Sequence, residues 1–378
     1  MRAAMWSAIS TGMALCIHCL STINTFVTAA NRMHSTNSTS RQLLRWRPIH
    51  GVMIALALIA PLVLTAWLGG AEALQRVRHF PLELLLLMLL LAFLCWNLNA
   101  MRMRLMLGGR AGRLGQRGAL GIELASKFAL CATPGGSGGP VTLLMLLAQR
   151  GFPPAKGAAV FLIDQGCDLL FFLAMLSGLV LFSLLIDTQW PHQSLVQWAL
   201  VGLALMATVV IVVMHYLPGL LRSTSVNTPW PSQYRRRWLA RRLLRCRHAL
   251  KVTLELPRAT LIAMMLLTTA HWLMRYSLLY LAVLGVGGHA DWMWTFLTQM
   301  LAMAASQLSF LPGGAGAAEV GVGSLLLPLM EREQAAAAVL VWRLVSYHLY
   351  LAAGAPLFVL YSYRMLRRSP ARQTCKNE

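Results

Sequence analysis

The stretch Ser309-Phe310-Leu311-Pro312-Gly313-Gly314-Ala315-Gly316-Ala317-Ala318-Glu319, near the carboxyl end of the chain, decides how this sequence folds. It separates the apolar runs 292–310 and 320–330, and a helix that crosses a bilayer comfortably needs about 20 apolar residues. Proline lacks an amide and glycine lowers helix propensity, so the first run should stop at Pro312. Glu319 then lies in the first turn of the second run, at the positive end of a half-helix. An ionisable residue beside broken backbone at membrane depth indicates a functional site.

A second glycine-rich stretch repeats this pattern in the first half of the chain. It reads Thr133-Pro134-Gly135-Gly136-Ser137-Gly138-Gly139-Pro140 and lies between the short apolar runs 120–132 and 141–148. The match continues downstream, where residues 158–164 align with residues 337–343 after one residue of slippage. A PGGxG motif followed by a span that begins Ala-Ala-Val occurs twice, so the sequence predicts an internal repeat.

Composition places the chain among polytopic membrane proteins. Of its 378 residues, 57% are hydrophobic and 12% are charged, and the mean hydropathy is +0.61. The net charge of +21 comes from arginines clustered between apolar spans, which favours the positive-inside rule and contact with anionic lipid over nucleic-acid binding. The seven cysteines are scattered, and the one close pair, Cys16 and Cys19, is weak support for metal or redox chemistry.

The predicted fold is all-α and polytopic, with six spans and two re-entrant helical hairpins. We expect spans at about 50–69, 81–99, 157–186, 194–216, 259–284 and 334–361, and hairpins at 118–150 and 292–330. A loop that carries Glu72, Arg76 and Arg78 should follow the first span, and a loop that carries Arg102, Arg104, Arg110, Arg113 and Arg117 should follow the second.

Charge counting sets the predicted orientation. The arginine-rich loop after the second span has no acid and should be cytoplasmic, whereas the loops 187–193 and 285–291 lack Lys and Arg and should be external. Hairpin 118–150 then dips in from the cytoplasm and hairpin 292–330 from outside. The two halves are therefore predicted to be inverted repeats.

The chain divides into three predicted parts. Residues 1–48 form an amino-terminal extension, residues 49–362 the membrane domain, and residues 363–378 a basic cytoplasmic tail. Within the membrane domain, repeat one covers about 81–186 and repeat two about 259–361. The basic segment 222–258 between them alternates arginines with apolar residues at near-helical spacing, which predicts an amphipathic helix on the inner leaflet.

Inverted repeats with broken helices place binding sites near the membrane midplane, where we expect the two glycine tips to approach each other. Half-helices that leave the tips would point free amides inward, which favours an anion such as phosphate. The alternative is that each PGG motif only turns a tight hairpin. The candidate substrate-binding or pathway residues are Pro312, Gly313, Gly314, Gly316, Glu319, Arg343, Arg275, Pro134, Gly135, Gly136, Gly138, Asp164 and Asp168.

The charged candidates allow two interpretations. Asp164 and Asp168 share one face of a span, Arg343 is the repeat equivalent of Asp164, and Arg275 lies inside another span. Either these residues form structural ion pairs, with Asp164 or Asp168 paired to Arg343 or Arg275, or both arginines bind an anionic head group while the aspartates and Glu319 exchange protons. One set of charges can also do both.

Other polar residues of the spans carry weaker signals. His271 and His348 could relay protons or could be packed with hydrogen-bonded rings. Glu123 and Lys127, four residues apart, should form a local pair. The sequence contains no metal-ligand cluster, nucleophile elbow, Walker loop or dinucleotide fingerprint, so we expect no enzyme activity, cofactor or metal.

These motifs resemble a known family. Pro312-Gly-Gly-Ala-Gly316 with Glu319, Pro134-Gly-Gly-Ser-Gly138, and Arg343 with Ser346-Tyr347 and Gly354 are similar to the flippase-like membrane domain of lysylphosphatidylglycerol synthases, over roughly residues 50–362. The sequence departs from the family pattern at Pro140 and at Asp164-Gln165, where the family often has an acid and an acid–arginine pair. The first half should therefore be less charged.

The resemblance implies a flippase that moves lipids or lipid-linked head groups between leaflets of the cytoplasmic membrane. The chain ends sixteen residues after the membrane domain, so we expect no aminoacyl-transferase domain of the kind that follows it in the synthases. The expected partners are a membrane lipid with an anionic head group and a lipid-biosynthesis enzyme. The alternatives are a carrier for a small solute or ion and a non-transporting partner of a lipid-modifying enzyme.

Overall fold

The computed structural model describes residues 48–108, 114–133, 135–186, 257–306, 309 and 311–368, together with 201–202, 205 and 208. These residues form helices and no β-strand, which confirms the all-α prediction for this part of the chain. The elements are α3 (Pro48–Arg78), α4 (Leu82–Met106), α5 (Gln116–Ala132), α6 (Gly138–Gln149), α7 (Pro154–Ile186), α10 (Arg258–Gly285), α11 (Trp292–Ser306), α12 (Ala317–Leu326), α13 (Arg332–Arg343), the π-helix η2 (Leu344–His348) and α14 (Leu349–Arg368).

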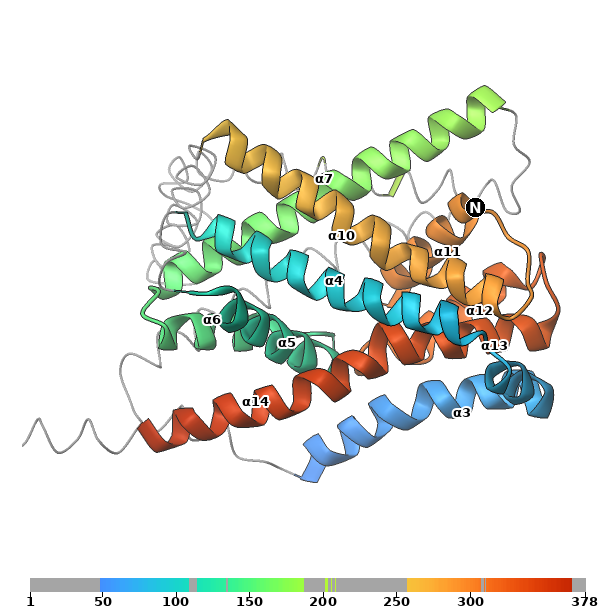
Figure 1. The fold of residues 1–378 in the computed structure, drawn as a ribbon, viewed down its shortest axis with the longest axis horizontal. Coiled ribbons are helices and arrows are strands. Elements are labelled where there is room, and N and C mark those ends of the chain that lie inside the picture. Colours follow the sequence, from blue (N-terminus) through green and yellow to red (C-terminus); the bar gives the residue numbers. More distant parts are fainter. Residues whose placement is uncertain are drawn as a thin grey trace, which may run out of the picture.

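Long apolar helices form the frame of the molecule (Figure 1). Three segments of the described chain are long and apolar enough to cross a membrane, namely Leu82–Met106, Lys156–Leu179 and Arg332–Met365. Helices α4 and α10 pack against each other at the centre, and α14 packs along α5. The chain is therefore a membrane protein by length and composition of its helices.

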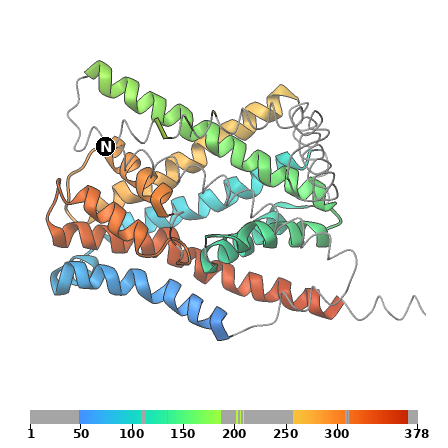
Figure 2. The same ribbon diagram turned by 180° about the vertical axis from the view of Figure 1, so that it is seen from behind.

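Two short helical hairpins lie inside this frame. Helix α5 packs on α6, and α11 packs on α12. Figures 1 and 2 show the α5–α6 hairpin at one end of the long helices and the α11–α12 hairpin at the opposite end. The contacts of the two halves also correspond, because α4, α5, α6 and α7 pack in succession, and so do α10, α11, α12 and α13.

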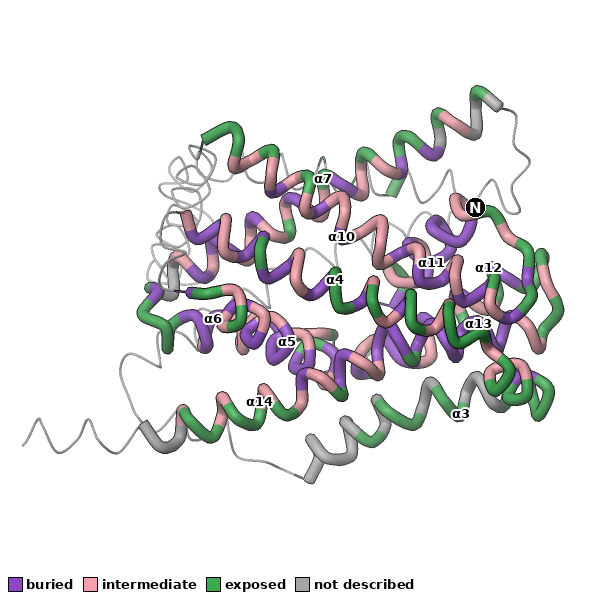
Figure 3. Tube along the Cα trace, viewed as in Figure 1, coloured by how far each residue is buried: buried purple, intermediate pink, exposed green. Residues whose placement is uncertain are grey.

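The outer surface is apolar and the polar residues gather inside, as expected of a protein whose solvent is lipid. The outward face of α4 exposes Leu82, Leu86, Leu90 and Phe93, which recur at helical spacing. Figure 3 shows that buried residues concentrate in the inner helices, α13 above all, whereas α3 and α14 carry exposed residues along their outer sides. Polar and charged side chains are buried in the interior, including Asn99, Arg102, Thr268, His271, Gln299, Glu319 and Arg343.

The predicted start of the arginine-rich loop after the second span is wrong. Helix α4 runs to Met106, so Arg102 and Arg104 belong to its last turns and not to the loop that follows. Arg102 is tolerated there because two carboxylates neutralise it, and Arg104 donates to the carbonyl of Leu114 and to the side chain of Gln116. Counting arginines after an apolar run could not distinguish an arginine inside the helix from one in the loop that follows.

The loop expected after the first span is also wrong. Helix α3 continues to Arg78, and its only non-helical residue is Gly70, with φ of 63°. Glycine adopts this positive φ at little cost, so the chain changes direction there without a loop. Arg76 then pairs with Glu331 at 3.1 Å, so a carboxylate balances its charge.

The last span is longer than the expected 334–361. It runs without interruption from Arg332 to Arg368 and contains a π-helical turn at Leu344–His348. The expected first residues of the basic tail, up to Arg368, are therefore helical. The predictions for residues 1–47, the external loop 187–193, most of the fourth span (194–216), the basic segment up to 256, and residues 369–378 lie outside the described residues.

Candidate functional site

The second glycine tip forms a tight turn that starts α12. Gly313, Gly314 and Gly316 have φ of 62°, 67° and 82°, in the region that favours glycine. The backbone amide of Gly316 donates to Oε2 of Glu319 at 2.6 Å, as in a capping box. The expected place of Glu319, in the first turn of this helix, is thus the place that the structure gives it.

The other carboxylate oxygen of Glu319 faces Arg343. Its Oε1 lies 2.6 Å from Nε of Arg343, and the two side chains are 0% and 3% exposed. The guanidinium also lies over the rings of Trp342 and Tyr347, with its Cζ 4.9 Å and 5.2 Å from the ring centroids. One acid and one base are matched in a site closed to solvent, so this pair is electrically complete.

Tyr347 connects the end of α5 to the second glycine tip. Its hydroxyl lies 3.2 Å from the carbonyl oxygen of Cys131, at the end of α5, and 3.4 Å from the carbonyl oxygen of Pro312. A phenol has one proton, so it can donate fully to only one of these carbonyls at a time. A Cβ on Gly313 would collide with the Tyr347 ring, which shows how closely the ring covers the second tip. Tyr347 therefore connects the end of α5, just before the first tip, to the second tip.

The first tip caps its own helix. Gly135 and Gly136 have φ of 58° and 67°, and the amide of Gly138 donates to Oγ1 of Thr133 at 2.8 Å. Pro134 lies outside the described residues. Because the amides of Gly138 and Gly316 already have acceptors within the chain, the free amides expected for an anion are in part occupied.

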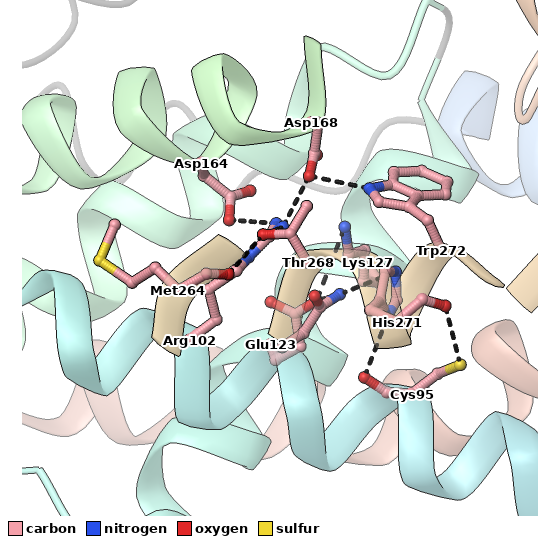
Figure 4. Close-up of polar contacts among 11 residues, drawn as sticks. Cys95, Arg102, Glu123, Lys127, Asp164, Asp168, Met264, Thr268, His271 and Trp272 are labelled. Atoms are coloured by element: carbon pink, nitrogen blue, oxygen red, sulfur yellow. Dashed lines mark hydrogen bonds and ion pairs between the residues drawn. The ribbon is translucent and has the colours of Figure 1, made fainter. Parts of the chain in front are cut away.

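A second charged cluster lies between α4, α7 and α10 (Figure 4). The buried guanidinium of Arg102 contacts both Asp164 and Asp168, and its Nη1 is 2.6 Å from Oδ1 of Asp168. The same nitrogen donates to Oγ1 of Thr268 at 2.9 Å, and Nε1 of Trp272 donates to Oδ1 of Asp168 at 2.8 Å. One guanidinium thus pairs with two carboxylates, so the three groups carry a net charge of −1 when both carboxylates are ionised.

Polar contacts continue from this cluster toward α5. Lys127 lies 3.6 Å from Oε1 of Glu123, which confirms the expected local pair, and Asn99 donates to the same oxygen at 3.0 Å. Nδ1 of His271 lies 3.2 Å from the carbonyl of Cys95, and its Nε2 lies 3.5 Å from the Asn99 amide. His271 is thus a packed histidine with a hydrogen-bonded ring (Figure 4).

Arg275 differs from the other buried arginines. Its Nη1 donates to the Tyr350 hydroxyl at 2.8 Å, its Nη2 donates to the carbonyl of Ser346 at 3.4 Å, and its Cζ lies 4.9 Å from the Tyr350 ring centroid. Within the described part of the chain, no carboxylate forms an ion pair with it. Ser346 precedes Tyr347, so this cation lies beside the tyrosine that contacts both the end of α5 and Pro312.

One prediction about these charges is wrong. The aspartates do not pair with Arg343 or Arg275, because Arg102 takes both of them and Glu319 takes Arg343. The first half holds a charged cluster made of Arg102, both aspartates and the Glu123–Lys127 pair.

Sequence reasoning missed Arg102 because it was counted as a loop residue. A signal was present: Cys95, Asn99, Arg102 and Met106 recur at spacings of four, three and four within an apolar run. That spacing places them on one helix face. All four are buried in the structure, so the stripe marks the inner side of α4.

His348 has hydrogen-bond partners on two elements. Its Nδ1 lies 3.1 Å from the carbonyl of Arg343, and its Nε2 lies 3.0 Å from the carbonyl of Leu58 in α3. The ring therefore connects α3 to the π-helical turn. Among the described residues, no group of three or more His, Cys, Asp and Glu side chains is placed to hold a metal ion.

Comparisons with known proteins agree with this architecture. Residues 52–354 match the model of the family described as lysylphosphatidylglycerol synthase TM region. The chain is also similar to a UPF0104 membrane protein of Archaeoglobus fulgidus, with 25% identity over 289 residues, which cover 71% of this chain and 85% of that protein. The family match includes both glycine-tipped hairpins.

Proposed function

Because the chain belongs to the lysylphosphatidylglycerol synthase TM region family, we propose that it is a flippase for a phospholipid or a lipid-linked anionic intermediate. The observation that carries the proposal is the place of Arg275, a cation without a carboxylate partner in the described chain, beside the tyrosine that connects the end of α5 to the second glycine tip. A guanidinium at membrane depth needs an anion or water, and a lipid phosphate supplies the anion.

The proposal includes a topology of six crossings and two re-entrant hairpins in inverted repeats. Helices of 17, 12, 15 and 10 residues make up the hairpins, and at about 1.5 Å per residue each is shorter than a hydrocarbon core of about 30 Å. Their places at opposite ends of the long helices support entry from opposite sides (Figure 1), and the arginine-rich loop before α5 favours the cytoplasmic side for α5–α6 and the outside for α11–α12. The carboxyl terminus is then on the cytoplasmic side, and the protein lies in the cytoplasmic membrane.

The route that we propose keeps the head group inside and the acyl chains outside. Buried charges line the interior, whereas the outward faces of the long helices are apolar and would contact the lipid tails. The Glu319–Arg343 pair is electrically complete and holds the second hairpin, so we assign it a structural role. Arg275 receives the phosphate, and Tyr350 orients its guanidinium. No bond of the lipid is made or broken.

Transport of sided lipid tests this function. In vesicles that contain the purified protein and a head-group-labelled anionic phospholipid in one leaflet, wild type should move the label across. Arg275→Gln should reduce the rate about tenfold to a hundredfold, as expected for the loss of a hydrogen bond to a charged group. Arg364→Gln is the matched control, because it makes the same substitution at an exposed arginine, and this variant should transport lipid at the wild-type rate.

Each other outcome of this assay counts against the proposal. Equal rates for Arg275→Gln and wild type would remove Arg275 from the route. Uptake of a water-soluble anion without lipid movement would identify a solute carrier. A folded wild-type protein that moves neither would fit a non-transporting partner of a lipid-modifying enzyme.

A further inference from the structure

We propose that Asp164 is a proton-binding site and that its proton is the coupling ion of transport. The first part stands on the Arg102 cluster alone, whereas the coupling rests on the proposed flippase function. The cluster brings two carboxylates to one guanidinium. Binding of one proton by one carboxylate would leave a neutral ion pair.

Charge balance inside a membrane makes this neutral form favourable. A lone excess charge in a medium of low dielectric is costly, and two carboxylates that share one site repel each other. Arg102 is 3% exposed, so water does little to screen the charges around it. Release of the proton restores the second contact to Arg102, which gives the cluster two states.

The two carboxylates are not equivalent. Asp168 accepts from Arg102 and from the indole nitrogen of Trp272, at 2.6 Å and 2.8 Å, so it stays an acceptor in both states. Among the described residues, Asp164 forms an ion pair with Arg102 alone, and its side chain is 28% exposed against 16% for Asp168. Asp164 is therefore the carboxylate that can exchange a proton while the Arg102–Asp168 pair remains.

The neighbours of Asp164 do not supply a second balancing cation. From α5, Glu123 and Lys127 face it as a mutual ion pair, from α4 it meets Arg102, and from α7 itself Asp168 and the thiol of Cys167. Helix α10 contributes Thr268, His271 and Trp272, whose polar atoms bond to other groups (Figure 4). Glu319 is different, because it is sealed at 0% exposure with one arginine of its own.

Infrared difference spectroscopy tests the site without transport. The carbonyl stretch of a protonated carboxyl group should appear at acid pH and disappear as reconstituted wild type is titrated to alkaline pH. Asp164→Asn should abolish this band, while the double substitution Glu319→Gln with Arg343→Met, which removes both charges of the other buried pair, should leave it unchanged. Asp164→Asn is expected to fold, because it keeps a neutral Arg102–Asp168 pair, and Asp164→Glu should restore a band. A wild type without a titrating band, or a band that survives in Asp164→Asn, would overturn the proposal.

Sided lipid transport under a pH gradient tests the coupling. Wild type should transport about tenfold faster with the gradient than without it, and Asp164→Asn should show equal rates in the two conditions. If wild type transports lipid at the same rate with and without the gradient, the coupling is overturned but the flippase function stands. A titrating Asp164 band in a protein that moves no lipid would support the proton site and contradict the flippase function.

Discussion

Arg102→Ala should destabilise the protein by about 3 to 5 kcal/mol, the loss expected when one partner of a buried ion pair is removed. The substitution leaves Asp164 and Asp168 next to each other without a cation, and it also removes the donor that Thr268 accepts from. Thermal unfolding of the purified protein in detergent or nanodiscs measures the loss. We expect most of the variant to be recovered as aggregate.

Two controls separate charge from packing in this experiment. Arg104→Ala removes an arginine two residues away that bonds to a carbonyl and an amide side chain, and it should cost much less. Adding Asp164→Asn and Asp168→Asn to Arg102→Ala removes the excess charges and should recover much of the stability. A stable Arg102→Ala single variant, or a triple variant no better than it, would contradict the charge argument.

Glu319→Ala should have a loss of similar size, about 3 to 5 kcal/mol, because it leaves the guanidinium of Arg343 buried without an anion. It also removes the acceptor of the Gly316 amide, so the start of α12 loses its cap. The same unfolding measurement applies, with a double substitution, Glu319→Gln with Arg343→Met, that removes both charges. We expect the double variant to be more stable than Glu319→Ala.

Glu331→Ala is the matched control for this second prediction. Glu331 also pairs with an arginine, at 3.1 Å from Arg76, but its side chain is 66% exposed. Solvent screens such a pair, so its loss should change stability by less than about 1 kcal/mol. Equal effects of Glu319→Ala and Glu331→Ala would show that burial does not set the strength of the Glu319–Arg343 pair.

The parts of the fold that could be predicted from the sequence depend on local signals. The glycine tips are visible because Pro312, the glycines and Glu319 follow one another within a few residues, and because the pattern occurs twice. The approach of the two tips is a prediction that rests on the repeat. For Tyr347 the sequence offers only its place in a family motif, because nothing local predicts that its hydroxyl reaches Cys131, 216 residues away.

The ion pairs could not be predicted for the same reason. Asp168 meets an arginine 66 residues earlier in the chain, and the choice among Arg102, Arg275 and Arg343 depends on how α4, α7 and α10 pack. The length of the helices also depends on these partners, since Arg102 can stay inside α4 only where two acids reach it. Arg275 was a candidate from its place in a span, but its lack of a carboxylate is a property of the packed structure.

The central claim is that the two hairpins enter the membrane from opposite sides and meet at Tyr347. Single cysteines in a cysteine-free background, treated with a membrane-impermeant maleimide on intact and on opened cells, test it most directly. The exposed positions Gly115 and Gln149 flank α5–α6, and His289 and Leu329 flank α11–α12. We predict that His289→Cys and Leu329→Cys react in intact cells, and that Gly115→Cys and Gln149→Cys react only after opening. Reaction of Gly115→Cys and Gln149→Cys from different sides would mean that this hairpin crosses the membrane, and it would contradict the account.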